Sequence, residues 1–400
     1  MDKLRMRTRG ILAGAAVVVV AGLAWAAPPP AARRPPPHVE NGNGNGNGND
    51  KADGPAKARP KVEVVFVLDT TGSMGGLIAG AKEKIWSIAK HIASAKPSPD
   101  VSIGLVAYRD IGDAYVTKKF ALSGDLDGVF EHLMSFRADG GGDTPEHVAK
   151  GLYDAVYGMQ WSESSMKMIF LVGDAPPHTD YGDGFDFEKI MKEASRREIR
   201  VHAIRCGNDP TTARYWKEIA SLGHGTFATI AGNGGVASVA TPMDGELADL
   251  GRKLNGTAIV YGDDDSRHRV TAKAEAAAAA PASAAADRGA YYARSGKSID
   301  ETDVLDQAAA KGGAGVLGMD ASKLPEPMRT LSPEEKKAFV VKKKAEREEI
   351  TKQMNEVSAR RDAYLKEQSA KDKSGTKADG FDAVVTKAVS EQGKEFGLSY

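Results

Sequence analysis

The chain has 400 residues, with 54 Lys and Arg residues balanced by 54 Asp and Glu residues. With a net charge of zero, nothing in the composition indicates steering toward nucleic acid or anionic lipid, and we expect no nucleic-acid partner. The chain has one cysteine, Cys206, so no internal disulfide is available and stability has to come from packing. Because Cys206 ends an apolar run, we expect a buried small hydrophobe and not a nucleophile.

Residues 1–27 have the parts of a secretory signal peptide. A basic start precedes a 13-residue apolar run, residues 11–23, which is short for a membrane span. Ala24-Trp25-Ala26 fits the small-x-small rule for cleavage after Ala26. We therefore expect an exported protein that is secreted or held in the periplasm or cell envelope. The alternative is an uncleaved anchor, and only then would the chain contact a membrane.

Residues 28–60 are rich in Pro and then in Asn and Gly, including the run NGNGNGNGND. Such a composition cannot bury apolar surface, so we predict a disordered linker. The linker would serve as a mobile tether for the rest of the chain. A leader segment without a role is the alternative.

The most informative segment is residues 62–74, VEVVFVLDTTGSM. Its apolar run is typical of a buried parallel strand, and it stops at Asp69. Thr71 and Ser73 follow at a spacing of two, on a turn through Gly72. Open α/β sheets place their sites on such turns, and carboxylate and hydroxyl oxygens suit a small, hard cation.

Two later segments supply further oxygens. Residues 140–146, GGGDTPE, read as a flexible loop that leads into a helix, with Thr144 as the N-cap and Pro145 at the first helical position. A second apolar strand, residues 167–172, stops at Gly173-Asp174. Because parallel strands end at one edge of a sheet, we expect Asp174 at the same edge as Asp69.

The other segments alternate between strands and helices, as a doubly wound α/β sheet requires. We predict a mostly parallel, six-stranded, Rossmann-like sheet flanked by helices over residues 61–255, with a helical extension at the C-terminus. The remaining strands are expected at 101–108, 115–122 (an edge strand), 199–206 and 225–230. The first helix is expected to begin near residue 77. Further helices are expected at 126–136, 145–157, 188–197, 211–222 and 236–254.

This pattern resembles the von Willebrand factor A domain. The metal-ion-dependent adhesion site of that family is written D-x-S-x-S, followed by a distant Thr and a distant Asp. The corresponding residues here are Asp69, Thr71, Ser73, Thr144 and Asp174. Thr71 stands where Ser is usual, which keeps the oxygen ligand and adds a methyl group.

The resemblance implies a bound divalent cation, Mg²⁺ in the first place, with Mn²⁺ and Ca²⁺ as alternatives. It gives direct or near-direct contacts to Ser73, Thr71 and Thr144, and direct or water-mediated contacts to Asp69 and Asp174. Two carboxylates roughly neutralise such an ion, and Mg²⁺ keeps exchangeable waters. The family's mode of action implies a protein or peptide partner that presents an Asp or Glu to the ion. We therefore expect an interaction or adhesion module without catalytic residues, not an enzyme.

Two other functions remain open. The sequence D-T-T-G-S also resembles the aspartyl nucleophile motif of haloacid-dehalogenase phosphatases, which would make Asp69 a nucleophile. Against that reading, those enzymes use an acid where this chain has Thr71, and a clear lysine motif is missing. The second alternative is a structural envelope scaffold whose metal site is idle. No phosphate-binding G-K-[ST] follows the glycine run at 140–142, and the sequence contains no zinc-binding H-E-x-x-H and no G-x-S-x-G elbow.

Several other polar residues are expected near this edge of the sheet. Asp110 and Asp113 follow the strand at 101–108, and we interpret them as solvated loop charges that could at most support the site. His178 is interpreted as an exposed loop histidine near the metal. Asp180 and Asp183 are loop acids without an assigned role.

The last third of the chain has a different composition. Residues 256–332 are rich in Ala and Gly with little periodicity, and we expect a partly ordered connector that wraps the preceding region. Residues 333–400 are charged and helical, beginning with the capping sequence Ser332-Pro333-Glu334-Glu335. A narrow apolar stripe, interrupted at Arg361, predicts docking on the domain at 61–255, a coiled coil with another chain, or contact with a partner. The stripe consists of Ile350, Met354, Val357 and Tyr364, and a second short helix is expected at 382–392.

Overall fold

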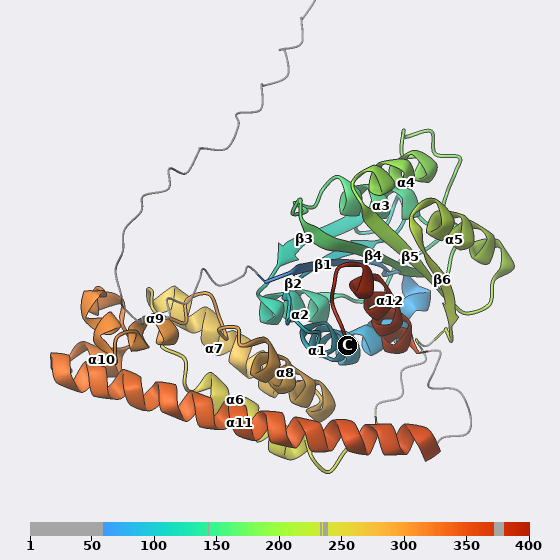
Figure 1. The fold of residues 1–400 in the computed structure, drawn as a ribbon. Coiled ribbons are helices and arrows are strands. Elements are labelled where there is room, and N and C mark those ends of the chain that lie inside the picture. The colour runs from blue at the N-terminus through green and yellow to red at the C-terminus, as the bar shows by residue number, and fades with distance from the viewer. Residues whose placement is uncertain (1–58, 143, 233, 235–238, 372–379) are drawn as a thin grey trace, which may run out of the picture. The chain divides into compact units, whose positions relative to one another are not determined.

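A computed structural model describes residues 59–142, 144–232, 234, 239–371 and 380–400 (Figure 1). The predicted signal segment (1–27), residues 28–58 of the predicted linker (28–60) and Asp143 lie outside the described residues. In the part that is described, no helix has the length and apolar character needed to span a membrane.

The predicted six-stranded sheet is confirmed. Its strands lie in the order β3-β2-β1-β4-β5-β6, and all neighbours are parallel except β3, which pairs with β2 in the antiparallel direction. The strand β1 lies at the centre and pairs with β2 on one side and β4 on the other. The bounds are β1 Lys61–Asp69, β2 Asp100–Tyr108, β3 Thr117–Ser123, β4 Ser165–Gly173, β5 Ile199–Cys206 and β6 His224–Ile230.

Helices cover both faces of the sheet, as a doubly wound fold requires (Figure 1). Alternate residues of β1 point to opposite faces, so Val64 and Phe66 belong to one apolar cluster and Val65 and Val67 to the other. One face is covered by α3, α4 and α5, and the other by α1 and α2 together with C-terminal helices. The bounds are α1 Gly75–Ala93, α2 Leu126–Ser135, α3 Val148–Val156, α4 Phe187–Arg196, α5 Pro210–Leu222 and α6 Asp244–Asn255.

Two predicted helix starts are wrong. The helix α3 begins at Val148, and its N-cap is His147, whose ring accepts a hydrogen bond from the Lys150 amide. The reason is that Glu146 is held in an extended bridge to Pro177, so the helix cannot start at Pro145. The helix predicted at 236–254 begins only at Asp244, and residues 236–238 of it lie outside the described part.

The region 256–332 contains more regular structure than expected. It forms α7 Asp264–Ala278, α8 Ala282–Ser295, the short α9 Leu305–Ala309 and α10 Glu326–Arg329, and two 3₁₀ turns at Ala314–Gly318 and Ala321–Lys323. Alanine has the highest helix propensity but contributes no clear apolar stripe, so a search for periodicity misses these helices. The Asp263 side chain caps α7 by accepting a hydrogen bond from the Ser266 amide.

The charged helix after Ser332 is confirmed as α11 Pro333–Lys371, and the second short helix as α12 Phe381–Glu395. The Ser332 hydroxyl and the Glu335 carboxylate form the predicted reciprocal cap at the start of α11. Ile350, Met354 and Val357 are buried, and α11 packs on α6 and α8. The apolar stripe is therefore used for docking within the chain.

Buried ion pairs join the extension to the sheet region, residues 61–255. Arg361 fills the gap in the apolar stripe: its Nε lies 2.6 Å from Asp244 Oδ1 on α6, and its Nη1 lies 2.6 Å from Asp287 Oδ1 on α8. Lys90 of α1 lies 2.7 Å from the same Asp287 oxygen. On α8, Arg288 forms a two-pronged pair with Asp127 of α2. These pairs fix how the helices sit against one another, because each charge needs its partner once it is desolvated.

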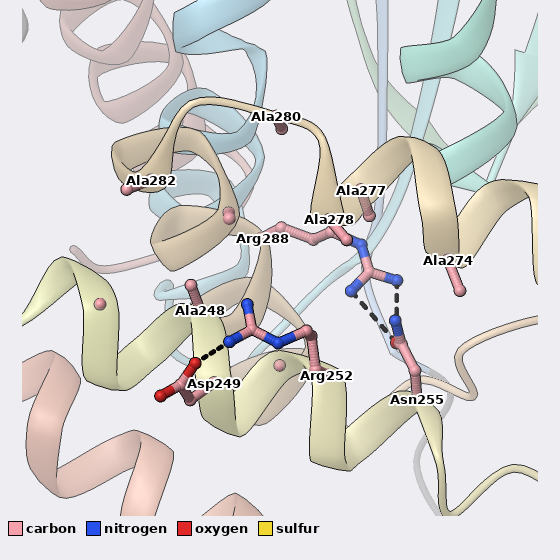
Figure 2. Close-up of a pocket in the computed structure, with 13 residues that line it drawn as sticks. Ala248, Asp249, Arg252, Asn255, Ala274, Ala277, Ala278, Ala280, Ala282 and Arg288 are labelled. Carbon is pink, nitrogen blue, oxygen red and sulfur yellow. Dashed lines mark hydrogen bonds and ion pairs between the residues drawn. The ribbon is translucent and has the colours of Figure 1, made fainter.

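A cavity of about 270 Å³ lies between α6, α7 and α8. Figure 2 shows that its walls are largely alanine side chains, which are too small to fill the space. Arg288 extends toward Asn255 at the end of α6, with both terminal nitrogens 3.2 Å from the Asn255 side-chain oxygen (Figure 2). Because the guanidinium of Arg288 is committed to Asn255 and Asp127, it is not available to an outside ligand.

Replacing Arg361 by Ala should lower the free energy of unfolding by about 3 kcal/mol, because the buried Asp244 loses its cationic partner and the buried Asp287 keeps only Lys90. The matched control is Arg360→Ala, which removes an exposed pair with Glu246 and should cost less than about 1 kcal/mol. Urea unfolding followed by circular dichroism measures both variants. Equal losses in the two variants would contradict a structural role for the Arg361 ion pairs.

Candidate metal centre

The turn after β1 arranges Asp69, Thr71 and Ser73 through short-range hydrogen bonds. The Thr71 amide and hydroxyl both donate to Asp69 Oδ1, at 2.9 and 2.7 Å. The hydroxyl oxygens of Thr71 and Ser73 lie 3.5 Å apart. The Gly72 amide donates to the Gly140 carbonyl at 3.2 Å, which ties this turn to the glycine loop. The spacing of two in the sequence thus places these oxygens on one small turn.

One pocket of about 260 Å³ lies at the carboxyl ends of β1 and β4, and we call it the edge pocket. Four of the five predicted ligands line it, from three separate segments of the chain. Asp69 lies behind Thr71, is fully buried and is not part of the lining. The lining residues are Thr71, Gly72, Ser73, Gly140, Gly141, Thr144, Glu146, Asp174 and Ala175.

The second carboxylate oxygen of Asp69 has an unusual environment. Oδ2 is buried and makes no hydrogen bond of normal length and angle with the described residues. A Cβ atom on Gly173 would lie 3.1 Å from this oxygen and 2.4 Å from the Tyr108 hydroxyl oxygen, so glycine is required for this close approach. A buried polar atom without a partner costs about 1–3 kcal/mol, and more when it is charged.

Burial is the main cause that raises the pKa of Asp69 from 3.8 to about 7. Repulsion from Asp174 also raises this pKa, whereas hydrogen bonds from Thr71 and from the Asp174 backbone lower it. Burial also raises the pKa of Tyr108 well above 10, with added repulsion from Asp69, Glu146 and Asp174. The phenol therefore stays protonated below the site. A cation in the edge pocket would relieve this concentration of negative charge.

Glu146 is a residue of the candidate site that the sequence did not predict. Its side chain is buried and lines the edge pocket. The Glu146 amide donates to the Pro176 carbonyl at 2.9 Å, and the Glu146 carbonyl accepts from the His178 amide at 3.0 Å. This bridge turns Glu146 toward the pocket. The acid two residues after Thr144 was the sequence signal for a further site residue. It was missed because Glu146 was expected to belong to a helix that begins at Pro145.

Glu146 changes the charge balance of the site. The predicted set has two carboxylates, and Glu146 adds a third at the edge pocket, for a formal charge of about −3 when all are ionised. No group of three His, Cys, Asp or Glu with metal-binding geometry occurs within the described ranges. A metal ion here would therefore have to use the hydroxyls of Thr71, Ser73 and Thr144 beside the carboxylates. Such an oxygen-only set suits a hard cation such as Mg²⁺ or Ca²⁺.

The expectation of solvated charges around the site is wrong for Asp110 and His178. Asp110 is buried, and it accepts a hydrogen bond from the Tyr181 hydroxyl at 2.5 Å. The His178 side chain is 8% exposed, and its Nε2 lies 3.5 Å from Asp110 Oδ2. Asp113 accepts the Gly141 amide and so supports the glycine loop. These contacts join loops that are distant in the sequence, which is why the local pattern did not reveal them.

Residues 63–240 match the family model described as von Willebrand factor A domain. A putative ariadne-like RING finger protein of Acanthamoeba polyphaga mimivirus is 30% identical over 120 residues, which are 29% of this chain and 11% of that protein. The alpha-protein kinase vwkA of Dictyostelium discoideum is 29% identical over 127 residues, 31% of this chain and 20% of the kinase. The von Willebrand factor A domain-containing protein 7 of Rattus norvegicus is 32% identical over 155 residues, 39% of this chain and 16% of that protein.

The chain thus spans between 11% and 20% of the length of these three curated relatives. Among solved structures, this chain is similar to a conserved hypothetical protein, BatB from Bacteroides thetaiotaomicron. The match covers 42% of this chain and 90% of the BatB chain, at 15% identity and a TM-score of 0.32. Proximal thread matrix protein 1 from the mussel byssus, with a zinc-occupied MIDAS motif, covers 43% of this chain and 41% of its own, at 17% identity and a TM-score of 0.34. The family match supports the expected von Willebrand factor A domain over residues 63–240.

Replacing Asp69 by Asn should make the metal-free protein more stable above neutral pH. Because burial raises the pKa of Asp69 to about 7, the folded state holds a proton that the unfolded chain releases above 3.8. The stability that this proton provides is complete below about pH 4 and is lost as the pH rises to about 7, an effect of at most about 4 kcal/mol. Urea unfolding in EDTA between pH 4 and 8 measures it. If the free energies of unfolding of the wild type and Asp69→Asn change with pH in the same way, the raised pKa of Asp69 is contradicted.

Proposed function

We propose that the edge pocket binds one divalent cation, Mg²⁺ with Mn²⁺ or Ca²⁺ as alternatives, and that this cation holds an acidic side chain of a protein or peptide partner. Thr71, Ser73 and Thr144 would hold the ion, with Asp69 and Asp174 acting directly or through water. When bound, the cation would supply a positive centre that accepts an oxygen from the partner. Domains of this family generally mediate protein interactions, which agrees with this function.

The observation that carries the proposal is the buried Oδ2 of Asp69. This oxygen is buried and makes no hydrogen bond of normal geometry with the described residues. Native proteins rarely keep such a group without a functional reason. A cation in the adjoining pocket offers the compensation, either directly or through an ordered water.

The phosphatase alternative agrees less well with the same geometry. A nucleophilic Asp69 would have to reach a phosphoryl group, but its side chain is fully buried behind Thr71 and does not line the edge pocket. Its other oxygen is engaged by two hydrogen bonds from Thr71. These features favour a binding module over an enzyme with Asp69 as nucleophile.

Titration of Mg²⁺ into the metal-free protein by calorimetry tests the ion site. Ser73→Ala and Thr144→Ala should each weaken Mg²⁺ binding by at least about 10-fold, because even supporting groups of a metal site contribute about 10–100-fold. Asp69→Ala should abolish metal-dependent binding of the partner while leaving the sheet folded. Ser221→Ala, at an exposed position of α5, is the matched control. Unchanged Mg²⁺ affinity in Ser73→Ala and Asp69→Ala would contradict the assignment of these residues to the ion site.

An array of short peptides tests the partner class. Peptides with a central Asp or Glu should be retained in Mg²⁺ and released by EDTA, whereas their Asn and Gln counterparts should not bind. If peptides are retained equally with and without EDTA, and equally whether they carry Asp or Glu or their amide counterparts, the result would support a scaffold with an idle site instead.

We also propose that the chain is exported. The basis is the arrangement of a basic start, an apolar run and Ala24-Trp25-Ala26 in the sequence. Mass spectrometry of the protein from a secreting host should find a mature N-terminus at Ala27. An intact Met1 in a membrane fraction would support the uncleaved anchor instead.

A further inference from the structure

A second cavity, of about 360 Å³, adjoins the edge pocket, and we call it the ring pocket. It lies between the N-terminal end of α3 and the loop that connects β4 to α4, two helices that Figure 1 shows on the same face of the sheet. Its lining consists of His147, His178, Thr179, Tyr181, Gly182, Asp183, Gly184, Phe185, Asp186, Phe187, Glu188 and Lys189.

The two pockets lie on either side of one backbone bridge. Glu146 lines the edge pocket and the next residue, His147, lines the ring pocket. On the facing segment, Ala175 lines the edge pocket and His178 lines the ring pocket. Extended strands rise about 3.3 Å per residue, so a peptide of a few residues is long enough to reach both pockets.

Aromatic rings form much of the wall of the ring pocket. The ring of Tyr181 lies 4.0 Å from that of His178 and 5.3 Å from that of His147, measured between centroids. The rings of Phe185 and His147 meet edge to face, with their centroids 5.7 Å apart. From outside the pocket, the Lys150 ammonium already lies 5.3 Å from the centroid of Phe185. Lys150 is also paired with Asp154 at 2.6 Å, so the ring of Phe185 contacts a cation without being the main group that holds it.

The charged groups of the ring pocket are mostly acidic. Asp183, Asp186 and Glu188 contribute three carboxylates, and Lys189 is the only Lys or Arg in the lining. Asp183 Oδ2 lies 2.7 Å from His147 Nε2, and Asp186 caps α4 while its other oxygen lies 3.4 Å from Lys189. Glu188 is exposed at the rim. The Asp, Glu and Lys side chains of the lining carry a formal charge of about −2, which disfavours an anion and favours a cationic group.

We propose that the ring pocket binds an arginine side chain of the same partner whose acid is held at the edge pocket, an inference that rests on the proposed function. A guanidinium is planar, stacks on rings and pairs with carboxylates, so it matches both properties of the pocket better than a compact, strongly hydrated ammonium. The partner is therefore a peptide segment with one acidic and one arginine residue within a few positions. The edge pocket supplies the metal dependence, and the ring pocket supplies selectivity for the neighbouring residue.

Two substitutions test the ring pocket without touching the candidate ligands. Phe185→Leu removes an aromatic ring and keeps apolar bulk, and Glu188→Lys reverses a charge at the rim. The matched control is Glu218→Lys, the same charge reversal at an exposed position of α5. Circular dichroism and thermal unfolding verify that each variant is folded before binding is measured.

The first measurement uses short peptides that contain Asp and Arg at spacings of one to four residues, in Mg²⁺. Replacing Arg by citrulline, which keeps the shape and removes the charge, should weaken binding by about 5- to 30-fold, the range expected for a desolvated cation–π contact. Phe185→Leu and Glu188→Lys should each reduce this preference for Arg over citrulline, and Glu218→Lys should not. Metal-dependent binding with no such preference would overturn the inference and leave the proposed function intact.

The second measurement is independent of the metal. Saturation-transfer NMR in EDTA, with N-acetyl-arginine methylamide as the probe, should give signals from the side-chain methylenes with the wild type. The signals should be lost with the citrulline analogue and in the double variant of Phe185→Leu and Glu188→Lys. Equal signals for the arginine and citrulline probes, or for the wild type and the double variant, would overturn the inference even if no peptide binds in Mg²⁺. A stronger signal from a lysine probe would overturn the assignment to arginine.

Discussion

The parallel pairing of β1 with both of its neighbours is the constraint on which the rest of this structure depends. Residues 61–69 of β1 pair in register with β2, and residues 61–68 pair with β4. This register brings Asp69 and Gly173 to the same edge, so that the turns after both strands face one pocket. It also places alternate side chains of β1 in two separate apolar clusters, each covered by its own layer of helices. The candidate site and both apolar clusters thus depend on the position of β1.

The helices beyond the sheet are held by charge as well as by apolar contact. Tyr291 and Tyr292 of α8 pack on Trp86 of α1 with centroid distances of 5.9 and 6.1 Å, and Phe381 of α12 lies 5.9 Å from Phe66. Around these contacts, Lys90, Arg361 and Asp287 join three helices through buried ion pairs. Apolar packing supplies most of the free energy, and the ion pairs select one arrangement among those that would bury similar area.

The sequence predicted the sheet because each parallel strand is an unbroken apolar run, and such runs leave little choice of structure. It predicted the edge pocket because polar residues follow two of those runs directly. Glu146 and Asp110 were misjudged because their burial depends on a bridge to Pro177 and on the Tyr181 loop, which are remote in the chain. The helices α7 and α8 were missed because alanine hides the boundary between apolar and polar faces. The apparent defect at Arg361 in the apolar stripe proved to be a buried ion-pair position, which no local pattern distinguishes from a solvated arginine.

The ends of the described chain lie at the opposite edge of the sheet from the edge pocket. Lys61 begins β1 and Asp69 ends it, which separates them by about 26 Å at a rise of about 3.3 Å per residue. Ser399 forms an antiparallel bridge with Lys96, between the end of α1 and the start of β2, so the C-terminus meets the same far edge. A coupling group at the C-terminus would therefore orient the molecule on a sensor chip with the edge pocket toward the solution. Immobilisation chemistry aimed at the loops at 140–146 or 175–186 would instead turn the edge pocket toward the chip.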